Sequence, residues 1–463
     1  MINHFNFKKF REKYLLTNDF GSYAFLNEKE FRDFISGKTD LRAGIGRELC
    51  EAGFAFEGSH VAFATSNAAR LMRMKAPLFC PTTLHILVLT TACNLSCVYC
   101  QAHDVHSNSK CLMNEETAER AIDIALQSPT PFLTFEFQGG EPLLNYRVLR
   151  HAVEYAEERK GNRSLRYSVV TNLTLLSDEI IGFFCDYGIQ ISTSLDGPAL
   201  VHDPNRPFRS GEGSFNAVTR ALEHVREAGL NVSCIQTTTR SSLKHAKEIV
   251  EAYCSLGFES IFIRPLTPLG VARAKWDIVG YTPDEFGTFY REALNAILQA
   301  NEKGYKLREG HASMFFEKLF FGEATNYMEL RSPCGASVGQ IAYHANGDVF
   351  TCDEGRMLYE MGDASFRLGN VHMHDYPKLV GSPICRATCA ASALESLPGC
   401  SDCVYAPYCG VCPVVNLALE NDLIAKSPNT YRCGVYSSML DTLFDIIYED
   451  NEIQMRAIRN WFD

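Results

Sequence analysis

Three cysteines, Cys93, Cys97 and Cys100, lie within the eight residues CNLSCVYC, directly after the apolar run LHILVLTTA. Cysteine thiolates hold iron–sulfur clusters, usually four per cluster, and short spacings let one loop wrap one cluster. Three cysteines leave one iron open, and an open coordination position is typical of catalytic rather than structural metal sites. The structural alternative is a zinc knuckle completed by His103 or His106. The motif therefore predicts a catalytic iron–sulfur site.

A second cysteine-rich region runs from residue 334 to residue 433, where nine of the eighteen cysteines fall within one hundred residues. Disulfides are disfavoured if the protein stays in a reducing compartment. The region has little periodic apolar pattern, so we expect it to be rich in loops and stapled by metal clusters. Asp353, directly after Cys352, is a candidate general base, and a turn-capping aspartate is the alternative.

Composition limits the classes of function. The 44 basic and 55 acidic residues of the 463-residue chain give a net charge of -11 and form no basic stripe, which argues against nucleic-acid binding. No segment reaches the roughly 18 apolar residues of a membrane span. The first residues, MINHFNFKKFREKYLL, lack the apolar core of a signal peptide. We therefore expect a cytoplasmic protein without a membrane partner.

Six apolar, β-branched-rich runs follow residue 83, with helix-like segments between them: LHILVLTT, FLTFEFQ, LRYSVVTN, IQISTSL, LNVSCIQTTT and SIFIRPL. This alternation favours an α/β fold with a parallel βα sheet or barrel. In βα barrels the chemistry lies in the loops after the strands. Candidate residues follow the first four runs: Cys93, then Gly139, Gly140 and Glu141, then Asn172, then Ser194 and Asp196. The sequence therefore predicts that these residues meet at one end of the sheet.

Four regions are predicted along the chain. Residues 1–78 form a small α+β, winged-helix-like unit, in which KYLLTND, SYAFLN and SHVAFAT are strand-like and EKEFRDFISG and DLRAGIGRELCEAG are helix-like. Residues 79–325 form the core with the six strands, residues 326–437 form the cysteine-rich domain, and residues 438–463 form a C-terminal helix.

The spacing Cys93-x3-Cys97-x2-Cys100, with Tyr99 before the last cysteine, resembles the signature of the radical S-adenosylmethionine (SAM) enzymes. The resemblance implies a partial (β/α)6 barrel whose three cysteines bind a [4Fe-4S] cluster. The amino and carboxylate groups of SAM would chelate the fourth iron. The implied activity is reductive cleavage of SAM to methionine and a 5'-deoxyadenosyl radical, which takes hydrogen from a substrate. An external one-electron reductant of the flavodoxin or ferredoxin type is the implied partner.

The same resemblance implies the SAM contacts. The GGEP loop would meet the SAM ammonium group, and Arg206 would pair with the SAM carboxylate. Each candidate has a plain structural alternative as a cap, a turn residue or, for Arg206, a surface salt bridge. The residues that the resemblance assigns to SAM binding are Tyr99, Gly139, Gly140, Glu141, Asn172, Ser194, Asp196 and Arg206.

The later cysteines resemble the SPASM extension of these enzymes, which holds two auxiliary [4Fe-4S] clusters. By order, the first auxiliary cluster would take Cys334, Cys352 and Cys412. The second would take Cys400, Cys403, Cys409 and Cys433. The two residues between Cys409 and Cys412 depart from the usual three. Cys385 and Cys389 are extra. One of them completes the first auxiliary cluster, or that cluster keeps an open iron for substrate; the plain alternative is that both are loop thiols.

SPASM enzymes mostly modify peptides, and the N-terminal unit resembles the winged-helix element that captures leader peptides as an extra strand. The stretches LLTNDFGSYAFLNEKEF, TCDEGRML and CVYAPYCGVCPVVNLALEND resemble the His-Xaa-Ser system radical SAM maturases. The implied function is an oxidative carbon–carbon or ether cross-link in a ribosomally made precursor peptide, with Asp353 as the proton acceptor. The alternatives are a formylglycine-forming sulfatase-type maturase, a thioether synthase and, outside enzymes, an iron–sulfur electron carrier or scaffold.

Overall fold

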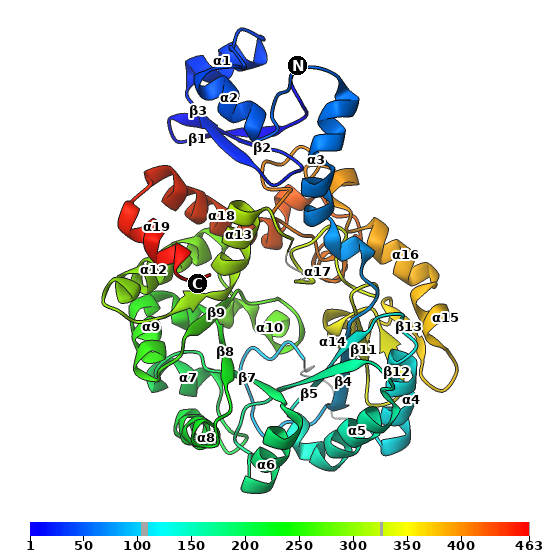
Figure 1. Ribbon diagram of the computed structural model, residues 1–463. Coiled ribbons are helices and arrows are strands. Elements are labelled where there is room, and N and C mark those ends of the chain that lie inside the picture. The colour runs from blue at the N-terminus through cyan, green and yellow to red at the C-terminus, as the bar shows by residue number, and fades with distance from the viewer. Residues whose placement is uncertain (103–109, 325–326, 463) are drawn as a thin grey trace.

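The computed structural model describes residues 1–102, 110–324 and 327–462 (Figure 1). Within these residues the strands form a three-stranded sheet and a ten-stranded sheet with the order β10-β9-β8-β7-β6-β5-β4-β11-β12-β13. The two histidines of the zinc alternative, His103 and His106, lie outside the described residues.

Six parallel strands form the centre of the large sheet, and each coincides with one predicted run. They are β4 (Leu84–Thr90), β5 (Phe132–Gly139), β6 (Ser164–Val170), β7 (Gln190–Ser194), β8 (Val232–Thr237) and β9 (Ser260–Arg264). All but the first residue of β4 are buried, as expected for a strand covered on both faces. The six predicted strands and their parallel arrangement are confirmed. The sheet does not close, because β10 (Arg308–Glu309) and β13 (Arg367–Asn370) are its edges.

The helices between these strands lie on the outer side of the sheet, whereas α10 (Gly270–Ala274) lies inside its curve (Figure 1). Their first turns are capped by side chains: Asn114 accepts a hydrogen bond from the Thr117 N–H at 2.8 Å. No helix among the described residues is long and apolar enough to span a bilayer. The helices of this region are α4 (Glu115–Ala125), α5 (Tyr146–Arg159), α6 (Asp178–Tyr187), α7 (Ala199–Asn205), α8 (Phe215–Glu227), α9 (Ala246–Ser255), α10 (Gly270–Ala274), α11 (Trp276–Val279), α12 (Pro283–Glu302) and α13 (Gly310–Phe321).

The cysteine-rich region is more regular than the sequence suggests. Its strand β11 (Gln340–Tyr343) pairs in parallel with β4, and β12 (Asp348–Phe350) and β13 continue the sheet as antiparallel strands. The expectation of a loop-rich domain is therefore wrong for this part. Its short strands are stabilised because they extend the central sheet through the pairing of β11 with β4. The region also contains α14 (Asp353–Glu360), α15 (Tyr376–Val380), α16 (Pro383–Ala390) and α17 (Pro413–Glu420). Cys352 thus follows β12, and Cys93 follows β4 of the same sheet.

The N-terminal unit has the predicted α+β composition with one correction. It contains β1 (Asn6–Phe10), β2 (Lys13–Thr17), β3 (Tyr23–Leu26), α1 (Glu28–Ile35), α2 (Gly44–Glu51) and α3 (His60–Met74). The stretch SHVAFAT, predicted to be a strand, forms the beginning of α3. The Ser59 side chain caps this helix by accepting a hydrogen bond from the Ala62 N–H at 3.2 Å, and a local cap outweighs the strand preference of the run.

The C-terminal segment forms two helices instead of one, namely α18 (Tyr431–Glu449) and α19 (Glu452–Arg459). Asp450 separates them in a left-handed conformation with φ at 47°. Because α18 begins at residue 431, the predicted domain boundary at residues 437 and 438 falls inside a helix. Cys433 consequently lies in the first turn of α18.

The N-terminal sheet packs directly against α18 and the loop before α17. Phe444 of α18 contacts the rings of Phe10, Tyr23 and Phe25, with centroids 5.8 to 6.4 Å away. The Thr17 hydroxyl donates a hydrogen bond to the Val404 carbonyl at 2.6 Å. The Asn6 amide donates to the Cys403 carbonyl at 3.0 Å. The N-terminal unit is therefore attached to the segment that carries Cys400 and Cys403.

We predict that Phe444→Ala loosens this attachment. The side chain is fully buried, and removing it leaves a cavity in an aromatic cluster, which costs about 3–5 kcal/mol. Urea denaturation of the protein will show an earlier transition. Phe132→Ala is the control, because Phe132 is 65% exposed and its loss is expected to change the free energy of unfolding by at most about 0.5 kcal/mol. Equal shifts in the two variants would contradict the packing role.

We predict an acid sensitivity that depends on His85 of β4. Burial lowers the pKa of His85 to about 3, while an unfolded histidine titrates near its ordinary value of 6.5. The unfolded chain therefore binds one more proton between these values, and stability falls as the pH drops below 6.5, by up to about 1.4 kcal/mol per pH unit. His85→Leu removes the contribution of His85 to this slope, while other buried histidines keep theirs. Urea denaturation between pH 7 and pH 4 measures it, and parallel profiles for the two proteins would refute the prediction.

Candidate active site and cysteine clusters

The loop with Cys93, Cys97 and Cys100 leaves the end of β4 and is fixed by backbone hydrogen bonds to distant segments. The Ser96 N–H donates to the Pro207 carbonyl at 2.8 Å, and the Val98 N–H donates to the Asn205 carbonyl at 2.9 Å. The Cys100 carbonyl accepts from the Val271 N–H at 2.9 Å. The loop is therefore held between the segment after α7 and the beginning of α10.

The two glycines after β5 allow the next chain segment to cross this loop closely. The Gly140 N–H donates to the Thr90 carbonyl and the Glu141 N–H to the Ala92 carbonyl, each at 2.8 Å. A Cβ atom at Gly139 would lie 2.3 Å from the Thr90 oxygen, and one at Gly140 would lie 2.2 Å from the Ala92 oxygen. Gly139 also has a positive φ of 154°. These contacts explain why both positions are glycine.

Glu141 joins the ends of β5 and β6. Its carboxylate is 1% exposed and accepts hydrogen bonds from the Leu143 N–H at 3.1 Å, the Thr171 hydroxyl at 2.6 Å and the Asn172 N–H at 2.8 Å. Burial raises the pKa of Glu141 to about 7, against the opposing effect of these hydrogen bonds. Both carboxylate oxygens therefore already have partners within the protein, and Glu141 holds this corner of the site.

Asn172 and Ser194 lie near the ends of neighbouring strands, as predicted. The Asn172 amide donates to the Asn94 side-chain oxygen at 2.9 Å and lies 3.9 Å from the Cys93 sulfur. Ser194 is the last residue of β7 and is half-buried. The ends of β4, β6 and β7 thus bring the predicted residues to one end of the sheet.

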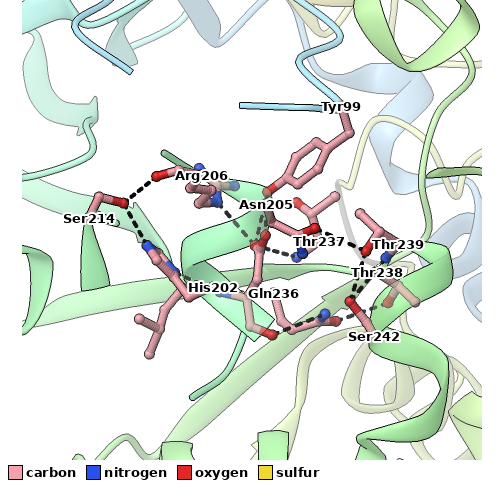
Figure 2. Close-up of polar contacts among 12 residues, drawn as sticks. Tyr99, His202, Asn205, Arg206, Ser214, Gln236, Thr237, Thr238, Thr239 and Ser242 are labelled. Carbon is pink, nitrogen blue, oxygen red and sulfur yellow. Dashed lines mark hydrogen bonds and ion pairs between the residues drawn. The ribbon is translucent and has the colours of Figure 1, made fainter. Parts of the chain in front are cut away.

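Asp196 and Arg206, both predicted to contact SAM, pair with each other. Figure 2 shows the positions of Arg206 and Tyr99. The fully buried Asp196 carboxylate accepts hydrogen bonds from the Tyr99 hydroxyl at 2.8 Å and the Arg206 Nε at 3.0 Å. The guanidinium group lies over the Tyr99 ring, 5.2 Å from its centroid. The side chain of Arg206 is 11% exposed, so the alternative of a surface salt bridge is wrong. The pair connects the cysteine loop to the segment after β7.

Further polar contacts hold the segment from Asp196 to Arg206, and Figure 2 shows those of His202, Ser214 and Arg206. The Asp196 N–H donates to Nδ1 of His202 at 3.3 Å, and Nε2 of His202 lies 3.0 Å from the Ser214 hydroxyl. Burial lowers the pKa of His202 to about 4, so the ring is neutral at pH 7. The Gln236 amide donates to the Asp196 carbonyl at 3.5 Å. The pair is therefore held by neutral groups of α7 and β8.

The three thiols of the loop fit a cluster. Burial raises the pKa of Cys93 to about 11 and that of Cys97 to about 12, and the charge of Cys100 raises both. Ligation requires thiolates, so metal binding would release protons here. Within the described residues no three His, Cys, Asp or Glu side chains converge on a single metal ion. A four-iron cluster instead takes one thiolate per iron. All eighteen cysteines lie in the described part of the chain as free thiols.

The three cysteines assigned to the first auxiliary cluster, here called the first auxiliary set, lie close together. Cys334, Cys352 and Cys412 are buried in one apolar cluster with Leu269 and Met357, and their thiols interact electrostatically. The Cys352 sulfur caps α14 by accepting a hydrogen bond from the Gly355 N–H at 3.3 Å.

Asp353 begins α14 and has a fixed partner. Its carboxylate accepts a hydrogen bond from Nε of the buried Arg356 at 3.1 Å, and a second from the same guanidinium group. Its charge also acts on Glu136 of β5, whose pKa burial raises. Asp353 therefore lies between the first auxiliary set and the central sheet.

The second auxiliary set lines one cavity, to which Cys400, Cys403, Cys409 and Cys433 all contribute. Three polar atoms of residues that line this cavity are buried and have no hydrogen-bond partner in the part of the chain that the structure describes. They are Asn416 Nδ2, Ser427 Oγ and Arg432 Nε. Four thiols and three unpaired polar atoms around one cavity fit a bound iron–sulfur cluster, whose sulfur atoms accept hydrogen bonds.

The extra cysteines, Cys385 and Cys389, lie one turn apart on α16. A hydrogen bond with Cys389 lowers the pKa of Cys385 to about 7, in spite of burial. Cys389 also interacts with the charge of Cys334. The pair therefore lies beside the first auxiliary set.

A charged network between the sheet and the auxiliary sets was not predicted from the sequence. Arg264, at the end of β9, lies 3.2 Å from the Glu329 carboxylate and 3.6 Å from that of Glu354. Arg432 lies 3.2 Å from Glu329. Burial raises the pKa of Glu329, but the two arginines together hold it well below its ordinary value. The sequence contained one indication of this network, because Glu354 and Arg432 each lie within two residues of a cysteine predicted to bind a cluster.

Comparisons with known proteins agree with this geometry. Residues 87–251 match the model of the radical SAM superfamily. An uncharacterized protein of Methanocaldococcus jannaschii is 28% identical over 183 residues, which are 40% of this chain and 62% of that protein. The cysteine-type anaerobic sulfatase-maturating enzyme of Clostridium perfringens is 24% identical over 301 residues, which are 63% of this chain and 78% of that enzyme.

Two solved structures share the fold. The structure of anSMEcpe with bound AdoMet and Kp18Cys peptide has a TM-score of 0.69 at 19% identity, covering 82% of this chain and 99% of that one. Streptococcus suis SuiB bound to the precursor peptide SuiA has a TM-score of 0.54 at 14% identity, covering 92% of this chain and 98% of that one. Residues 87–251 are therefore similar to the radical SAM superfamily, and the wider chain shares its fold with these two structures.

Proposed function

We propose that this protein is a radical SAM peptide maturase that installs an oxidative carbon–carbon or ether cross-link in a ribosomally made precursor peptide. One observation carries the proposal: the three-cysteine loop meets the ends of β5, β6 and β7. Two further sets of cysteines lie in the same protein. A loop that is fixed by the backbone at both ends suits a catalytic centre that must hold its geometry.

The residues divide the work at this centre. Cys93, Cys97 and Cys100 would hold a [4Fe-4S] cluster, with SAM as the ligand of the fourth iron. When bound, the cluster and SAM supply reductive cleavage and hydrogen abstraction. The glycine crossing at residues 139 and 140 would fix the position of the backbone next to the cysteine loop, because both glycines contact the chain between residues 90 and 92. Asn172 and Ser194 offer polar groups beside it, while Tyr99 and the pair of Asp196 and Arg206 form its wall.

The peptide substrate would be captured by the N-terminal unit. Both solved structures that share the fold hold a peptide, namely SuiA in SuiB and Kp18Cys in anSMEcpe, which supports a peptide substrate. A leader peptide would add as a strand to an edge of the three-stranded sheet. The sheet's attachment to the segment of Cys403 would hold the leader at a fixed position relative to the core.

The auxiliary clusters would accept the second electron that ring closure releases, and Asp353 would accept the proton. The location of Asp353 next to Cys352, near Glu136 of the central sheet, supports this role. The ion pair with Arg356 keeps its carboxylate in place. Cys389 is the candidate for the fourth ligand of the first auxiliary cluster, since it lies beside Cys334.

The second candidate is a formylglycine-forming maturase, which oxidises a cysteine or serine of a protein substrate. The observation that favours it is the similarity to the sulfatase-maturating enzyme of Clostridium perfringens and to anSMEcpe. The product distinguishes the two candidates, because formylglycine is an aldehyde that reacts with hydrazides and a cross-link is not.

We predict that the anaerobically reconstituted protein carries on the order of 12 irons per chain, because each of three sites would hold four. Cys93→Ala is expected to reduce this to roughly 8 and to abolish the release of 5'-deoxyadenosine from SAM after reduction. Iron assays and chromatography measure both quantities. Cys185→Ala is the matched control, since this exposed thiol lies on α6 outside the three sets. SAM cleavage that survives in Cys93→Ala would refute the proposed centre.

We predict that co-expression with its precursor peptide, for which a short His-Xaa-Ser-rich peptide encoded nearby is the candidate, gives a product lighter by two hydrogen atoms. Asp353→Asn is expected to cleave SAM at the normal rate yet give at least tenfold less product, because the proton acceptor is lost. Tandem mass spectrometry locates the bond. Asp186→Asn, an exposed change on α6, is the control. A hydrazide-reactive product would establish the second candidate instead, and full product from Asp353→Asn would exclude Asp353 as the acceptor.

A further inference from the structure

Arg432 lies between the two auxiliary cysteine sets. It is the second residue of α18, next to Cys433, and it lines the cavity of the second set. Its positive charge interacts with Cys412 of the first set and with Cys409 of the second. One cation therefore acts on both sets.

The Arg432 side chain is held in a fixed orientation. Its Nη1 donates to the Glu329 carboxylate at 3.2 Å, and its Nη2 donates to the Glu329 backbone carbonyl at 3.1 Å. The guanidinium group lies over the Tyr436 ring, 4.4 Å from the centroid. The remaining group, the buried Nε–H, has no acceptor within residues 1–102, 110–324 and 327–462. A cluster in the cavity would offer sulfur atoms to this donor.

The surroundings of the two sets differ in polarity. Asn416 Nδ2 and Ser427 Oγ are also buried, and both residues line the second cavity. The Ser427 hydroxyl acts on the Cys400 thiol and lowers its pKa against the larger, opposite effect of burial. The first set instead packs against Leu269, and the acid Glu354 interacts with all three of its thiols. Positive charge and hydrogen bonds to sulfur stabilise a reduced cluster, whereas negative charge and an apolar environment destabilise it.

We propose that Arg432 is a positioning residue that raises the reduction potentials of both auxiliary clusters, and that its Nε, together with Asn416 and Ser427, makes the second cluster the easier of the two to reduce. The inference rests on the two auxiliary clusters of the proposed function. An electron that reaches the first cluster would then pass to the oxidised second cluster, which is reduced by one electron as the first is reoxidised. The second cavity is thus the exit side of the electron path.

The test is a potentiometric titration of the anaerobically reconstituted full-length protein, followed by electron paramagnetic resonance. In Arg432→Gln we expect both auxiliary midpoint potentials to become more negative, with the larger shift at the second cluster. Arg432→Lys keeps the charge, so the first cluster is expected to return toward the wild-type value while the second stays shifted. Ser427→Ala is expected to shift the second cluster alone. Arg291→Gln is the matched control, because Arg291 is a half-exposed arginine that pairs with Asp445.

Iron content separates the possible failures. Arg432→Gln with the wild-type iron content and the potentials of the Arg291→Gln control would overturn the inference and leave the proposed function intact. If Arg432→Gln loses iron, the Ser427→Ala variant provides the test instead. An unchanged midpoint potential of the second auxiliary cluster in Ser427→Ala would then overturn the inference. A wild-type protein that carries one cluster only would overturn the auxiliary clusters of the proposed function and this inference together.

Discussion

The close backbone crossing between the end of β4 and the segment after β5 is the constraint on which the site depends. Two hydrogen bonds join residues 140 and 141 to residues 90 and 92, and neither glycine has room for a Cβ atom. The Glu141 carboxylate then ties this crossing to β6 through neutral donors. Because the three-cysteine loop begins at residue 93, the position of its first thiol follows from main-chain geometry that side-chain packing alone does not provide.

Helix α18 connects the remaining parts of the molecule. Its first turn carries Arg432 and Cys433 at the second auxiliary set, and Phe444 farther along packs against the N-terminal sheet. One rigid helix therefore reaches from a cysteine cavity to the unit proposed to bind a leader peptide. The neighbouring loop repeats this connection, since the Cys403 and Val404 carbonyls accept hydrogen bonds from β1 and β2. The proposed peptide-binding unit and the second auxiliary set share a single packing interface.

The sequence predicted the six central strands well, because a strand buried on both faces appears as a continuous apolar run. The strand predicted for residues 59–65 was wrong, because Ser59 caps a helix that begins there. The sequence predicted which side chains follow the strands, but not that Asp196 and Arg206 bind each other, since pairing depends on how two loops meet. The unpaired atoms of Asn416, Ser427 and Arg432 leave no sequence signal, because an absent partner is a property of packing.

The attachment of the N-terminal sheet to α18 has a consequence for biosynthesis. Lys8 and Asp441, which form an ion pair across this interface, are 433 residues apart in the chain. At roughly 5–20 residues per second, the ribosome needs about 20–90 s to produce the second partner after the first. During that interval the aromatic face formed by Phe10, Tyr23 and Phe25 lacks the Phe444 ring that covers it in the folded protein. The interface can therefore close only after most of the polypeptide has been synthesised.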